Sequence, residues 1–69
     1  MFEVNDRVKT KFGNGTIEYF EILAEKCYFV TKLDDDIKNY RICVRLDEGH
    51  TWAFKDQLCC FYESELELM

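Results

Sequence analysis

The sequence has no proline, only three glycines, and a single histidine and serine. Disordered linkers are rich in proline, whereas this chain is 48% hydrophobic and 16% aromatic, which is the composition of a folded domain. His50 lies in the turn-like segment DEGH, and Ser64 lies among glutamates that would not activate it. Because nucleophilic and general-base catalysis need such groups beside one another, we expect a non-enzymatic protein without a cofactor.

Long apolar runs are also missing, and the N-terminus is charged within its first three residues. We therefore expect neither a signal peptide nor a transmembrane span, and we expect a cytoplasmic location. With 69 residues, the chain is predicted to form one domain, residues 1–69.

The four cysteines form no C-x-x-C pair of the kind that zinc sites use. Cys59 and Cys60 are adjacent, so in a strand their side chains would point to opposite faces. We expect reduced thiols that are mostly buried and act as small apolar residues, including Cys27 and Cys43. The three consecutive carboxylates of 34–36 lack the spacing of a calcium loop and are predicted to be an exposed loop tip, so no metal site is expected.

The net charge is −5, and the acidic excess lies in residues 47–69. A nucleic-acid-binding protein usually carries a basic excess, because phosphate contacts supply much of its affinity. Direct binding of DNA or RNA is therefore disfavoured, although the short basic segment Arg7–Lys11 keeps it as a third hypothesis. The acidic region raises a second hypothesis, an inhibitor of phage type that imitates nucleic acid on a host or defence protein. Its surface would consist of Asp47, Glu48, Asp56, Glu63, Glu65 and Glu67.

Apolar residues alternate with polar ones nearly everywhere, most clearly in YRICVRL (40–46). Such alternation is typical of half-buried strands. Strands are predicted at 6–11, 15–23, 27–33, 40–46 and 51–55, separated by turns at 12–15, 24–26, 34–39 and 47–50. Residues 56–69 fit either a strand, a turn and a short strand, or a 3-10 turn at 63–65 that leads into a last strand at 66–69, and the second interpretation is preferred. Five to six short antiparallel strands at this length predict an all-β fold, a small SH3-like or Tudor-like barrel.

The segment FGNG (12–15) allows two interpretations. Backbone N–H groups of a glycine-rich loop can hold a phosphate, but such loops usually carry a lysine and lead into a helix. Here a strand pattern follows, so we expect a β-hairpin in which Gly13 and Gly15 supply positive φ angles.

The opening segment VNDRVKTKFGNGTIEYF (4–20) resembles the start of the C-terminal Tudor-like domain of PcrA/UvrD-type helicases. The RNA-polymerase-interaction domains of CarD and of the transcription-repair coupling factor open in a related way. The ending ESELELM is similar to that of small SH3-like proteins of phages and Gram-positive bacteria. The matching residues are Asn5, Asp6, Val8, Phe12, Gly13, Gly15, Thr16 and Ile17. The resemblance implies an adaptor that docks on RNA polymerase, whereas the acidic final third with CCFY does not match the family pattern.

The leading functional hypothesis is a protein-interaction module that binds RNA polymerase or another nucleic-acid-handling protein. Tyr28 and Phe29 are neighbours in a predicted strand, so one of them must point outward, and exposed aromatic residues favour protein contacts. The candidate contact residues are Phe12, Tyr19, Trp52 and Phe54. Trp52 and Phe54 share one face of their predicted strand, which is either part of the core or the binding surface.

Overall fold

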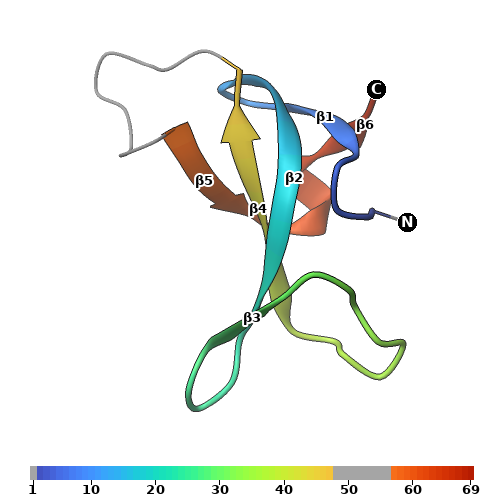
Figure 1. Ribbon diagram of the computed structural model, residues 1–69, viewed down its shortest axis with the longest axis vertical. Coiled ribbons are helices and arrows are strands. Elements are labelled where there is room, and N and C mark those ends of the chain that lie inside the picture. Colours follow the sequence, from blue (N-terminus) through green and yellow to red (C-terminus); the bar gives the residue numbers. More distant parts are fainter. Residues whose placement is uncertain (1, 48–56) are drawn as a thin grey trace.

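The computed structural model describes residues 2–47 and 57–69, which form six strands and a 3-10 turn (Figure 1). The elements are β1 (Arg7–Thr10), β2 (Gly13–Ile22), β3 (Tyr28–Val30), β4 (Tyr40–Leu46), β5 (Leu58–Phe61), η2 (Glu63–Glu65) and β6 (Glu67–Leu68). The predicted all-β fold is confirmed. Within this described part of the chain, no helix has the length and hydrophobicity that crossing a bilayer requires.

All six strands belong to one antiparallel sheet, in the order β5-β4-β2-β1-β6, with β3 also paired to β2. The ten-residue β2 is its central strand, because it pairs with β4 along most of its length. Its first residues also pair with β1 and its last three with β3. A β-bulge between Ile17 and Tyr19 interrupts the β2–β4 register, and bulges of this kind increase strand bending. The turn η2 then connects β5, at one edge, with β6 at the other (Figure 1).

The hydrophobic core lies on one face of this sheet. Ile42, Val44 and Leu46 of β4 all point into it, as the alternating pattern of that strand predicts. They pack with buried residues from the other strands and from the end of η2, namely Val8, Ile17, Phe20, Cys59, Phe61 and Leu66. Each fully buried large apolar side chain contributes about 1.5–3 kcal/mol, so a core of this size is needed to hold so short a chain together.

The predictions for β1, β2, β4 and the 3-10 turn at 63–65 are confirmed, with small differences at the strand ends. The strand expected at 27–33 is shorter, because β3 pairs only with the last three residues of β2. Both Tyr28 and Phe29 are exposed there, at 50% and 59%. The strand β5 belongs to the other interpretation of 56–69, in which a strand precedes the turn, so the structure combines features of both interpretations. The strand expected at 51–55 and the turn after Asp47 lie outside the described residues.

The cysteine prediction is half correct. None of the four cysteines is in a disulfide, and Cys43 and Cys59 are buried. Cys27 is exposed in the loop between β2 and β3, and Cys60 is exposed on β5, so the expectation of mostly buried thiols is wrong for these two. Cys59 and Cys60 do face opposite sides of their strand, as their adjacency predicts.

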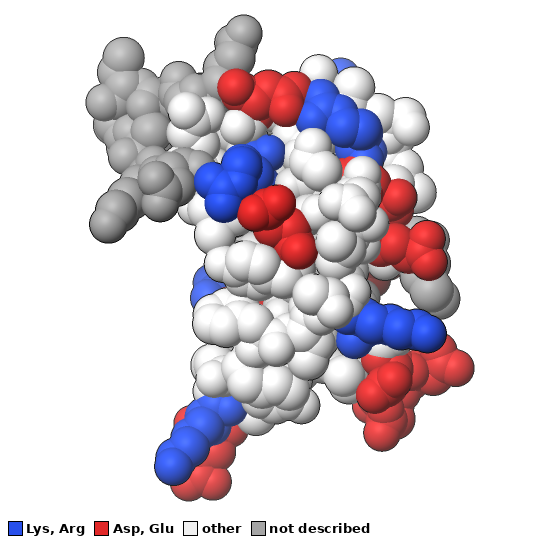
Figure 2. Space-filling model, viewed as in Figure 1, with Lys and Arg blue, Asp and Glu red and all other residues white. Residues whose placement is uncertain are grey.

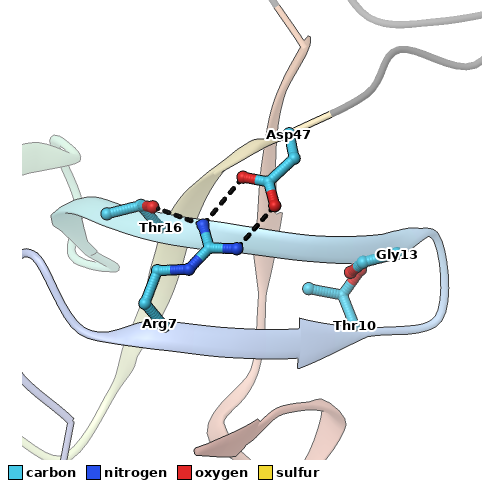
Figure 3. Close-up of polar contacts among 5 residues, drawn as sticks. All are labelled: Arg7, Thr10, Gly13, Thr16 and Asp47. Atoms are coloured by element: carbon cyan, nitrogen blue, oxygen red, sulfur yellow. Dashed lines mark hydrogen bonds and ion pairs between the residues drawn. The ribbon is translucent and has the colours of Figure 1, made fainter. Parts of the chain in front are cut away.

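The segment FGNG forms the β1–β2 hairpin, in which Thr10 pairs with Gly13. The Thr10 hydroxyl donates to the Gly13 carbonyl, and Figure 3 shows these two residues side by side at the hairpin. The same hydroxyl accepts the Phe12 N–H, so Thr10 holds the turn. Gly13 has φ of +120°, so the expectation of a positive φ is correct for this glycine. The expectation is wrong for Gly15, which has no positive φ. A glycine is required at this position because its backbone lies so close to β4 that a Cβ atom would overlap with that strand.

Candidate protein-binding groove

A groove of about 770 Å³ opens between the segment that precedes β1 and the loop that joins β3 to β4. Its volume falls within the range of about 300–1,000 Å³ that is typical of ligand sites. The apolar part of its lining consists of Phe2, Val4, Phe20, Leu33, Ile37 and Tyr40. All of these except Phe20 are half-buried, so the groove presents apolar surface to solvent.

Local hydrogen bonds fold the N-terminal wall of the groove back onto the sheet. Asn5 adopts a φ of +77°, and its N–H donates to the Ile17 carbonyl of β2. The Asp6 carboxylate accepts the N–H of Glu3, which closes a tight turn. As a result Phe2 and Val4 pack against the core instead of extending into solvent.

The opposite wall is the loop 31–39. The Ile37 N–H donates to the Asp34 carbonyl, which closes a turn at the acidic tip of the loop. The Leu23 N–H donates to the Asn39 carbonyl, which connects the end of the loop to the residue after β2. Leu33 packs against the core, whereas Ile37 is half-buried and is not among the residues packed there. Ile37 is therefore the apolar residue of this wall that is most available to a bound partner.

Phe20 and Tyr40 form the floor, with their rings edge to face and their centroids 6.3 Å apart. The Tyr40 hydroxyl donates to Glu63 Oε2 at 2.8 Å, which connects β4 to η2 at the groove edge. Burial raises the pKa of Tyr40, and the hydrogen bond to Glu63 raises it further. Tyr40 thus stays a hydrogen-bond donor at neutral pH and holds the floor in place.

The rim of the groove is mainly acidic. Glu3, Asp34, Asp35 and Glu63 line it, and among the described lining residues Lys32 is the one cation. Acidic side chains gather at the tip of the β3–β4 loop (Figure 2). An apolar floor with an acidic rim is complementary to a segment that carries apolar and basic side chains.

The structure does not bring the predicted contact residues together. Phe12 packs on the core side, and the centroid of its ring lies 6.0 Å from the centroid of the Phe61 ring. Lys11 Nζ lies 5.4 Å from the centroid of the Phe12 ring. Tyr19 lies on the outer face of β2, edge to face with Phe29 at 5.0 Å. Neither lines the groove, and Trp52 and Phe54 lie outside the described residues.

Sequence reasoning missed the groove because its walls are far apart in the chain. The only local signal is a pair of apolar residues, Leu33 and Ile37, on either side of the carboxylates 34–36. Isolated apolar residues in a polar loop are common, so this signal does not by itself identify a site.

The acidic residues of the nucleic-acid-mimic hypothesis are partly engaged within the protein. Asp47 accepts two hydrogen bonds from the Arg7 guanidinium, which also donates to Thr16 (Figure 3). These hydrogen bonds hold the pKa of Asp47 below its usual value. Glu65 accepts the N–H of Tyr62 and pairs with Lys11 at 3.5 Å, and the pKa of Glu65 is lowered by these contacts in that order.

Two of the remaining acidic residues, Glu63 and Glu67, are exposed, although Glu63 accepts from Tyr40. Glu48 and Asp56 lie outside the described residues. Two basic side chains of the segment Arg7–Lys11 are used in the ion pairs described above. In the described part of the chain, no three His, Cys, Asp or Glu side chains are placed to hold a metal ion.

Most residues that carry the helicase-domain resemblance have structural roles. Asn5 and Gly13 occupy backbone conformations with positive φ, Val8 and Ile17 are 0% exposed in the core, and Gly15 allows β4 to approach. Such roles specify a hairpin and a core but do not select a partner. Comparison with protein-family models, with curated proteins and with solved structures gave no match for this chain.

Proposed function

We propose that this protein is a non-enzymatic interaction module, built on an SH3-like or Tudor-like barrel, that acts in the cytoplasm. The observation that carries the proposal is the groove, which combines half-buried apolar side chains, among them Ile37 and Tyr40, with an acidic rim. Its occupant is a segment of a partner protein that places apolar side chains on the floor and Lys or Arg beside the rim. Burial of apolar surface supplies affinity, and the opposite charges select the partner and its orientation.

The proposed partner is a protein that handles nucleic acid, with RNA polymerase as the case that the helicase-domain resemblance implies. Such proteins present basic surfaces, and these suit the acidic rim formed by Glu3, Asp34 and Asp35. The groove is favoured over a purely acidic mimic because Asp47 and Glu65 are already paired with cations of the same chain. The same ion pairs occupy Arg7 and Lys11, which weakens the third hypothesis of direct nucleic-acid binding.

The test is a selection from a displayed library of random short peptides, with the wild-type protein as bait. Selected peptides are then measured by fluorescence anisotropy against Ile37→Ser, which removes an apolar side chain from the groove. Phe29→Ser is the matched control, because Phe29 is 59% exposed and lies outside the groove. We expect enrichment of peptides in which Lys or Arg stands beside Leu, Ile or Phe. We also expect Ile37→Ser to lose about tenfold in affinity, equivalent to 1.4 kcal/mol, and Phe29→Ser to retain it.

Other outcomes would contradict the proposal in distinguishable ways. Equal affinity for wild type and Ile37→Ser would exclude the groove as the binding site. Purely basic peptides whose binding disappears at high salt, unaffected by Ile37→Ser, would favour the acidic mimic. Binding of short oligonucleotides at low salt, in place of peptides, would favour the nucleic-acid hypothesis.

A further inference from the structure

Cys43 of β4 and Cys60 of β5 lie directly opposite each other in the antiparallel register. Residues in such positions have Cα atoms about 4.5–5.5 Å apart, which is inside the range of about 4.4–6.8 Å that a disulfide requires. Their Sγ atoms are 2.7 Å apart. A disulfide bond is about 2.0 Å long, so the two sulfurs need to approach by only about 0.7 Å, without movement of either strand.

The two thiols differ in their access to solvent. Cys60 is exposed, whereas Cys43 has 0% exposure, although both are on the outer face of the sheet. An external reagent can therefore reach Cys60 and cannot reach Cys43 directly. This arrangement suits a pair in which the exposed cysteine reacts first and the buried one second.

Neighbouring groups shift the pKa values of the two thiols in opposite directions. The hydrogen bond between the two thiols lowers the pKa of Cys60 to about 7, and it is the largest cause of the raised pKa of Cys43. Arg41 also lowers the pKa of Cys60, while burial and the nearby Glu21 oppose this. Since the thiolate is the nucleophilic form, Cys60 is the more reactive sulfur of the pair at neutral pH.

We propose that Cys60 and Cys43 form a thiol–disulfide exchange site that accepts small, soluble disulfides. In the first step, the Cys60 thiolate attacks one sulfur of the external disulfide, forms a mixed disulfide and releases one external thiolate. In the second step, Cys43 loses its proton, which reaches the released thiolate through solvent, and attacks the Cys60 sulfur, which expels the second external thiolate. The two protein thiols are oxidised to one disulfide, and the external disulfide is reduced to two thiols that take up both protons.

The test uses oxidised glutathione as the probe and intact-mass spectrometry with peptide mapping as the readout. The Cys27→Ser background removes the other exposed thiol, which has no cysteine partner in the described residues. In that background we expect loss of two hydrogens and a cross-linked Cys43–Cys60 peptide. Adding Cys43→Ala should stop the reaction at a mixed disulfide on Cys60, and adding Cys60→Ala should abolish both products. Because Cys60 is exposed, its replacement spares the core, so that variant remains informative even if Cys43→Ala fails to fold.

The rate gives a second readout. Because the pKa of Cys60 is lowered, a larger fraction of this thiol is ionised at pH 7 than of an ordinary cysteine. We therefore expect Cys60 to react faster with oxidised glutathione than an unstructured peptide with one cysteine does. A mixed disulfide that persists on Cys60 with Cys43 intact would overturn the proposal, as would no reaction at Cys60. Neither outcome affects the peptide-binding proposal, which involves a different face.

Discussion

Replacement of Gly15 by alanine tests the structural interpretation of the first hairpin. Gly15 lies in β2 between Val8 of β1 and Leu46 of β4, so its backbone is paired on both sides. An added Cβ would stand 2.6 Å from Val44 Cγ1 and 2.6 Å from the Arg45 carbonyl oxygen. The carbonyl cannot swing away, because β4 is itself held between β2 and β5.

Relief of this overlap requires separation of β2 from β4 or a shift of buried Val44, and overpacking of this kind costs about 1–3 kcal/mol. A domain of 69 residues has a total stability of roughly 3–10 kcal/mol, from about 0.05–0.15 kcal/mol per residue. The expected loss of stability is therefore a large part of the total free energy of unfolding. Urea unfolding followed by far-UV circular dichroism should show a lower midpoint with an unchanged slope. Each kcal/mol should also lower Tm by about 4–8 °C.

Asn14→Ala is the matched control, since Asn14 is the exposed neighbour of Gly15 in the same strand and keeps its backbone bonds. Its stability should stay within about 0.5 kcal/mol of wild type. The reasoning is refuted if Gly15→Ala is as stable as Asn14→Ala. A fully folded Gly15→Ala protein that had lost peptide binding would instead restore the view that the hairpin holds a ligand.

Three further perturbations have expected outcomes. Arg7 holds the pKa of Asp47 in the folded protein below its value of about 3.9 in the unfolded chain. The ion pair therefore stabilises the fold above a pH of about 3.9, and this stabilisation is lost as the pH falls through the pKa of Asp47 in the folded protein. Asp47→Asn should accordingly be less stable at pH 7 and show a weaker loss on acidification, as measured by thermal unfolding between pH 2 and 7; an unchanged acid profile would contradict this. Phe20→Ala removes a fully buried ring, should cost about 3–5 kcal/mol and should leave little folded protein by circular dichroism at 25 °C, whereas a cooperative wild-type-like melt would refute it. Oxidation of the pair Cys43–Cys60 closes a loop of 17 residues and should raise the free energy of unfolding by up to about 3 kcal/mol, a gain that a reductant must reverse.

Several local features could be predicted because they depend on neighbouring residues. The alternation in YRICVRL is sufficient to place Ile42, Val44 and Leu46 on the core side of β4. The adjacency of Cys59 and Cys60 is sufficient to place them on opposite faces. Turn-forming residues between alternating segments likewise indicated hairpins.

Predictions failed where the answer depended on which strand lies beside which. Gly15 was assigned a positive φ, yet the structure shows that its requirement is a close approach to β4. Cys60 was expected to be buried with the other thiols, yet its place on the outer face of β5 leaves it exposed.

The sequence by itself determined the all-β class, the strand periodicity, the first hairpin and the terminal 3-10 turn, since each follows from residues within a few positions of one another. Only the tertiary structure decided the two candidate sites. The groove joins the N-terminal segment with the loop 31–39, and the dithiol joins Cys43 with Cys60, which are 17 residues apart. No sequence spacing encodes these juxtapositions, because they arise from the order and register of the strands in the sheet.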